Sequence, residues 1–133
     1  MADARLRWLF SGATLTLIFI ALVSVVVVPM YSNYTERAHA SSMIAELSSL
    51  RAEIESEALR IGSLQGVGAS IELDPHRRMA KSASLVRILE NGVILAQTAT
   101  SGSLLILEPR LINGSVEWSC IGGPRVDMPT QCR

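Results

Sequence analysis

The chain has 133 residues, a length that holds one ordinary domain and leaves about 100 residues for a water-facing part once the hydrophobic N-terminal end is set aside. Its 12 Lys and Arg residues balance its 12 Asp and Glu residues, so no basic excess argues for nucleic-acid binding and no acidic excess argues for disorder. The hydrophobic content of 49% is high for a soluble protein, and much of it lies before Tyr31. These totals predict one small domain attached to a membrane.

The N-terminal part is predicted to span the membrane as a helix. No charged residue lies between Arg7 and Glu36, and residues 8–31 form an apolar run of 24, which crosses a hydrocarbon layer of roughly 30 Å at about 1.5 Å per residue. The run is longer than the core of a cleavable signal, and too long without charge for the core helix of a soluble protein. Because Arg5 and Arg7 precede it, residues 1–7 are expected in the cytoplasm and the later residues across the membrane.

A proline interrupts this apolar run near its end. Pro29 removes one backbone donor and clashes with the preceding turn, and the four valines before it have weak helix propensity. We expect the helix to kink or loosen near residues 25–29 and then to continue.

Residues 32–61 are predicted to form the second, amphipathic half of the same helix, ending at Gly62 as a C-cap. Glu53, Glu55 and Glu57 alternate along it and are interpreted as hydrated surface. Apolar residues recur at spacings of three and four, which predicts one stripe facing a core. The stripe consists of Met43, Ile44, Leu47, Leu50, Ile54, Ala58 and Ile61.

Residues 62–83 show no sustained period and are predicted to be a connecting loop. A local positive patch within it is a candidate contact for DNA or another anionic ligand, although a short basic loop is more often simply solvated. The patch consists of His76, Arg77, Arg78 and Lys81. His39 and His76 lie at no metal-ligand spacing from a cysteine or carboxylate, and no catalytic set or cofactor motif is visible. The sequence therefore predicts neither an enzyme nor a metal or cofactor site.

Residues 84–133 are predicted to form a four-stranded antiparallel meander. Four apolar runs are divided by turn signals that include Asn91-Gly92 and Asn113-Gly114, for which we expect type I′ turns with positive φ at both residues. Pro109 cannot donate to a ladder, so the third strand should bend or bulge there. The amphipathic stripe is the available partner for the apolar face of the sheet. The predicted fold class is α+β: a long N-terminal helix packed on a four-stranded sheet.

The two cysteines, Cys120 and Cys132, would lie on the exported side, where oxidation is allowed. A disulfide that closes a loop of about a dozen residues would stabilise the small domain by about 3 kcal/mol in the chain-entropy model. Two free thiols are the alternative, and a metal site is disfavoured because no histidine or further cysteine lies near.

Two stretches of the chain together resemble the type IVa pilin family. The junction PMYSNYTERA is similar to the family's pattern at this place, and NGSVEWSCIGGPRVDMPTQCR is similar to its terminal strand and disulfide-bound loop. The matching residues are Pro29, Tyr31, Tyr34, Thr35, Arg37, Ala38, Trp118, Cys120, Pro129, Cys132 and Arg133. The resemblance implies a subunit that waits in the bacterial inner membrane and is extracted by the pilus assembly machinery. It then joins copies of itself or other pilins in an extracellular filament of the kind used in cell adhesion.

The start of the chain departs from that family pattern. Pilins are cut after a glycine by a prepilin peptidase and carry a glutamate at the fifth mature position, and counting back from Pro29 places these positions on Arg7 and Gly12. Cleavage after Gly12 would instead give a chain that begins at Ala13 and has Leu17 as its fifth residue. An uncut chain creates no buried amine and needs no buried carboxylate to pair with it.

Three functions therefore stay open. The first is a structural subunit of a type IV pilus or a closely related filament. The second is an unprocessed pilin-like membrane protein that regulates or accompanies assembly, and the third is a minor pilin that binds DNA or a surface ligand.

Overall fold

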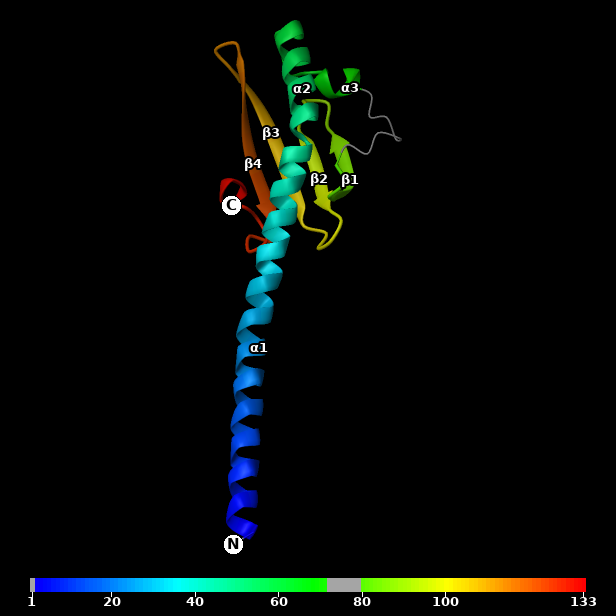
Figure 1. Cartoon of the computed structure of the whole chain (residues 1–133). Coiled ribbons are helices and arrows are strands. Elements are labelled where there is room, and N and C mark those ends of the chain that lie inside the picture. The colour runs from blue at the N-terminus through cyan, green and yellow to red at the C-terminus, as the bar shows by residue number, and fades with distance from the viewer. Residues whose placement is uncertain (1, 72–79) are drawn as a thin grey trace. The chain divides into compact units, whose positions relative to one another are not determined.

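A computed structural model describes the backbone of residues 2–71 and 80–133, and the side chains of these ranges from Gly12 onward (Figure 1). The chain divides into two compact units, Met1–Tyr34 and Thr35–Arg133. We refer to residues 12–31 as the apolar segment and to residues 35–133 as the head.

Helix α1 (Ala2–Glu46) contains Pro29 and continues beyond it, as expected. A kink at this proline stays a prediction. Leu47 separates α1 from α2 (Ser48–Ile61), yet its N–H donates to the Met43 carbonyl and its own carbonyl accepts from Arg51, both at 3.0 Å. The amphipathic half therefore keeps helical hydrogen bonds across the interruption.

The end of α2 follows the predicted C-cap. Gly62 adopts a left-handed conformation with φ of 75°, and its N–H donates to the Ala58 carbonyl at 2.8 Å. A residue with a Cβ is disfavoured in this conformation, which explains why the helix ends at a glycine.

The sheet is the predicted antiparallel meander. Its strands are β1 (Ala83–Ile88), β2 (Ile94–Thr98), β3 (Leu104–Ile112) and β4 (Ser115–Gly123), in the order β1-β2-β3-β4. The α+β architecture of a long N-terminal helix and a four-stranded antiparallel sheet is thus confirmed. Figure 1 shows α2 running beside this sheet.

The head core lies between the helix stripe and the inner face of the sheet. Met43, Leu47, Ile54 and Ala58 are fully buried, and Leu50 is 2% exposed. The stripe was predicted one residue too long, because Ile61 is the last residue of α2 and is 42% exposed. The buried helix face begins earlier than predicted, at Ala40. The other buried core residues come from α3, the segment between α2 and β1, the strands and the C-terminal part: Val67, Ile71, Ala80, Ile94, Ala96, Leu105, Leu107, Met128 and Cys132.

Two short helices were not predicted. Helix α3 (Val67–Ser70) lies in the segment expected to be a loop, and the 3-10 helix η1 (Thr130–Cys132) follows β4. Helix α3 begins after Gly66, whose φ is 85°, and Val67 is fully buried. A helix of four residues is too short to produce a visible sequence period.

The two Asn-Gly turns differ. At Asn113-Gly114 both φ values are positive, 50° and 78°, as a type I′ turn requires. At Asn91-Gly92 the prediction was wrong, since only Gly92 has a positive φ, of 79°. Here the Gly92 N–H donates to the Leu89 carbonyl at 2.9 Å, and the Leu89 N–H donates to the Val93 carbonyl at 2.8 Å. The loop therefore has three residues, with glycine at the left-handed position.

Of the bend or bulge expected at Pro109, the bulge is absent from β3, and a bend stays a prediction. The β3–β4 register runs without a shift from Leu104 to Ile112, and Pro109 pairs with Trp118. The β2–β3 pairing ends at Leu107, so Pro109 lies where one side of β3 has no partner strand in the described sheet. A missing donor can be tolerated at such an edge. The irregularity in the sheet lies instead in β1, between Ala83 and Leu85.

Candidate functional site

The apolar segment is the largest exposed hydrophobic surface that the structure describes. Every residue from 12 to 31 is exposed. In the described ranges, one helix is long and apolar enough to cross a membrane; its most apolar 18-residue window has a mean hydropathy of 2.5 and no buried residue. A helix that is apolar on every side requires an apolar environment from outside its own chain.

Two hydroxyl groups of the apolar segment are satisfied by the helix itself. Thr16 Oγ1 donates to the Gly12 carbonyl and Ser24 Oγ donates to the Ile20 carbonyl, each at 2.8 Å. Hydrogen bonds of this kind within one helix allow Ser and Thr to lie in hydrocarbon without an unsatisfied donor. The hydroxyl donors at these two positions therefore need no partner outside the helix.

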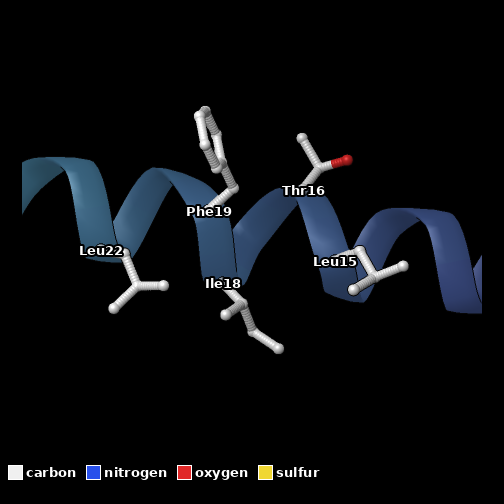
Figure 2. Close-up of a pocket in the computed structure, with 5 residues that line it drawn as sticks. All are labelled: Leu15, Thr16, Ile18, Phe19 and Leu22. Atoms are coloured by element: carbon white, nitrogen blue, oxygen red, sulfur yellow. The ribbon is translucent and has the colours of Figure 1, made fainter.

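Figure 2 shows side chains on two sides of this helix. Thr16 and Phe19 project to one side, and Leu15, Ile18 and Leu22 project to the other. All five belong to α1, so the hollow that they line is an open surface between neighbouring side chains of one helix. Such a surface suits lipid chains or another helix, because both fill ridges and grooves by van der Waals packing.

The residues predicted as a cleavage site and as a helix kink lie within α1. Gly12 and Ala13 are both exposed, and a Cβ placed on Gly12 would meet no described atom within 4 Å. Pro29 lies in the same helix. Neither cleavage nor a kink follows from this placement, and both stay predictions.

The positive patch is described at one of its four positions. Lys81 is exposed and lies in the turn before β1. His76, Arg77 and Arg78 lie outside the described residues. A role of this patch in binding DNA stays a prediction.

A disulfide joins Cys120 of β4 to Cys132 of η1, with 4.5 Å between their Cα atoms. Cys132 is fully buried, and the loop between the cysteines is held on the head by further contacts. Arg37 Nε donates to the Val126 carbonyl at 2.7 Å, and Ser103 Oγ donates to Asp127 Oδ2 at 3.1 Å. The loop is therefore anchored both to the helix and to the β2–β3 turn region.

An Arg-Trp-Glu cluster, consisting of Arg51, Trp118 and Glu55, connects α2 to β4. The Arg51 guanidinium lies over the Trp118 ring, 5.0 Å from its centroid, and Trp118 Nε1 donates to Glu55 Oε1 at 2.7 Å. The sequence interpretation missed this cluster and described Glu55 as hydrated surface. The available signal was the spacing of four between Arg51 and Glu55, but the strand position of the tryptophan that meets them depends on the tertiary fold.

Glu46 connects the helix to the segment before β1. Its Oε2 accepts from the Ser82 N–H at 3.1 Å, and its Oε1 accepts from the Ser82 hydroxyl at 3.0 Å and from Ser42 Oγ at 3.3 Å. The hydrogen bond from the Ser82 backbone, with smaller contributions from the two hydroxyls, lowers the Glu46 pKa from its ordinary value of 4.5, against a smaller opposing effect of burial. Elsewhere on α2, the hydrogen bonds from Arg60 lower the pKa of the half-buried Glu57 to about 2.

The outer face of the sheet carries a second apolar surface. Pairing aligns Arg87, Leu95, Ile106 and Ile121 across the four strands on the face that points away from the core. Ile121 is 59% exposed, and Leu85 and Leu104 in the adjacent row are also exposed. We call Leu85, Leu95, Leu104, Ile106 and Ile121 the outer-face patch.

The described residues contain no group of three or more His, Cys, Asp and Glu side chains gathered to hold a metal ion. In comparisons with protein-family models, curated proteins and solved structures, nothing matches the chain.

Proposed function

We propose that the chain is a structural subunit of a type IV pilus or a closely related filament, held in the bacterial inner membrane until it assembles. The observation that carries the proposal is the exposure of the whole apolar segment in a helix whose continuation forms part of the head core. The apolar segment would then be surrounded by lipid before assembly and by the helices of neighbouring subunits afterwards. The resemblance at residues 29–38 and 118–133 supports the same proposal.

The physical chemistry of the segment fits such an exchange. Leaving lipid for a helical bundle brings no gain from leaving water, because both surroundings are apolar. Association then depends on close packing, for which the side chains around Phe19 and Leu22 provide ridges and hollows. Extraction from the membrane requires machinery, and the assembled bundle has to supply the contacts that lipid supplied before. The outer-face patch offers a second contact surface between heads of neighbouring copies.

A pilin-like protein that stays in the membrane is the second candidate. It is favoured by one observation: residues 8–35 contain no carboxylate, so the family's glutamate has no counterpart in the apolar run. A subunit without this carboxylate lacks one means of pairing with the amine of a neighbour. In this role the same apolar segment would engage filament subunits or the assembly platform within the bilayer.

One experiment separates the two candidates. Surface filaments are sheared from the cells, the remaining cells are fractionated, and the chain in each fraction is identified and its N-terminus sequenced. The subunit proposal expects the chain in the sheared filaments, beginning at Ala13 if Gly12 is cut. The retained protein would stay with membranes and begin at Met1 or Ala2. Intact chain recovered only from the cytosol would contradict both candidates.

A further inference from the structure

The head contains a groove of about 400 Å³ beside the disulfide. Residues from the end of α1, from α2, β3, β4 and η1 line it, so all of its walls belong to the head. Ile44, Leu107 and Cys120 give it an apolar surface, and Arg51 and Trp118 line it beside them. Ser119 and Gln131 complete the lining, which is polar as well as apolar. A groove of this size lies in the range of small-molecule sites.

Arg51 is the cation of this groove, and the Nε–H group of its guanidinium lacks a hydrogen-bond partner in the described part of the chain. Its Nε is shielded from solvent and has no hydrogen-bond acceptor among the described residues. The nearby carboxylate, Glu55, instead accepts from the Trp118 indole. The guanidinium carbon lies over the Trp118 ring, and this cation–π contact favours that position of the charge. A buried donor of a charged group without an acceptor is unfavourable, so a ligand in the groove gains from supplying one once the Arg51 side chain turns enough to open Nε to the groove.

The chemistry of the groove selects the ligand class. A carboxylate is planar and accepts two parallel hydrogen bonds from the Nε and Nη edge of a guanidinium. The apolar part of the lining, chiefly Ile44 and Trp118, suits a compact aliphatic or aromatic body. Glu55 beside the cluster opposes a high negative charge, which disfavours phosphates and other polyanions compared with a monoanion.

We propose that the groove binds a small organic monocarboxylate, with its carboxylate on Arg51 and its apolar body against Ile44, Leu107 and Trp118. The proposal concerns the head and is independent of whether the chain assembles into a filament.

The test is a titration of the full chain in zwitterionic lipid nanodiscs with benzoate, followed by the side-chain NMR signals of Arg51 Nε–H and Trp118 Nε1–H. Both signals should shift saturably. Benzamide has the same ring without the charge and should bind at least about tenfold more weakly, since it cannot form the charge-assisted pair. The absence of a saturable shift with benzoate, or equal binding of benzamide, would overturn the proposal.

Three variants locate the site. Arg51→Lys keeps the charge but loses the planar fork, so binding of benzoate should weaken at least about tenfold. Arg87→Lys on the outward face of β1 is the matched control and should leave it unchanged. Ile44→Phe adds bulk to the groove without removing Arg51 and should also weaken binding, which covers the case that Arg51→Lys disturbs the fold. Benzoate affinity unchanged in both groove variants would assign the shifts to another place and reject the groove.

Discussion

The apolar segment and the core stripe of the head belong to the same run of helix but differ in what surrounds them. In the apolar segment all residues from 12 to 31 are exposed, although 15 of these 20 are hydrophobic. In the stripe, Met43, Leu47 and Ile54 are fully buried against the head. Hydrophobicity alone therefore does not decide burial, because a side chain is buried only where the fold brings it a partner.

The pattern of the residues between the hydrophobic ones explains the difference. From Glu36 onward, charged and polar residues separate the apolar ones and leave one face for the sheet. Before Glu36 no face is polar, so no orientation of the helix could satisfy both water and a core. The apolar segment therefore depends on apolar surroundings from outside the chain, whereas the stripe is buried by the sheet of its own head.

The largest expected effect comes from the same substitution made in both regions. Leu47→Ala removes a fully buried side chain and should lower the free energy of unfolding of the head by about 2–5 kcal/mol, since it loses burial and leaves a cavity. Leu22→Ala removes a side chain that is 62% exposed and should change the same quantity by less than about 0.5 kcal/mol. Chemical denaturation of the full chain in detergent micelles, followed by tryptophan fluorescence, measures both. Equal effects would contradict the division between the regions.

A charge placed in the apolar segment should impair membrane insertion and leave the stability of the head unchanged. Leu22→Arg puts a cation near the middle of the predicted span and should make membrane insertion less favourable by about 2.5–3.5 kcal/mol, with the head still folded. Ala45→Arg, at an exposed position of the amphipathic half, is the matched control and should leave insertion unchanged. An insertion assay that reports the apparent free energy compares them. If both variants insert like the parent chain, the segment is not the membrane anchor.

The fold was predictable where the sequence carries a local signal. The length of the uncharged run, the spacing from Met43 to Ala58 and the glycine at 62 each have a physical meaning that does not depend on distant residues. The four strands were also predictable from local signals, since turn residues divide their apolar runs. The Asn91-Gly92 turn was mispredicted because the dipeptide favours a two-residue loop, whereas here Glu90 joins a three-residue loop.

The candidate sites depended more on tertiary structure. The groove requires Arg51 from a helix and Trp118 from a strand to meet across 67 positions in sequence, and no local pattern encodes that contact. Likewise, Pro109 causes no bulge in β3, because β2 does not extend to it and no hydrogen bond from its nitrogen is needed on that side. By contrast, the exposed apolar segment was predictable, since a span of this kind is defined by composition alone.

Two glycines, one in the head and one in the apolar segment, provide a third and smaller test of the contrast between a packed and an exposed region. A Cβ on Gly68 would collide with the Leu89 carbonyl oxygen, which is backbone and cannot move aside alone. Gly68→Ala should therefore destabilise the head by about 1–3 kcal/mol. Gly12→Ala meets no described atom within 4 Å and should not lower head stability. Thermal unfolding of the two variants measures the difference, and an unperturbed Gly68→Ala head would show that α3 is not packed on the β1–β2 hairpin.

The pH dependence of stability should also reside in the head, because residues 8–35 contain no ionisable side chain other than the tyrosines. Hydrogen bonds from Ser82 lower the folded-state pKa of Glu46 from 4.5. A lowered pKa means that the folded head holds the proton less tightly than the unfolded chain. The contribution of Glu46 is therefore present above about pH 4.5 and is lost as the pH falls through the lower folded-state pKa.

Glu46→Gln removes this titration and should lower stability at pH 7 by about 1 kcal/mol or less, since the site is partly open to solvent. The difference from the parent chain should shrink as the pH falls below 4.5, because the protonated carboxyl of the parent then resembles the amide. Glu53→Gln, at an exposed position on α2, is the control and should show no such convergence. Unfolding midpoints measured from pH 7 to pH 3 compare the three chains. A Glu46→Gln difference that stays constant over this range would mean that the carboxylate charge does not contribute, and that Ser82 is held before β1 by contacts other than its hydrogen bonds to this carboxylate.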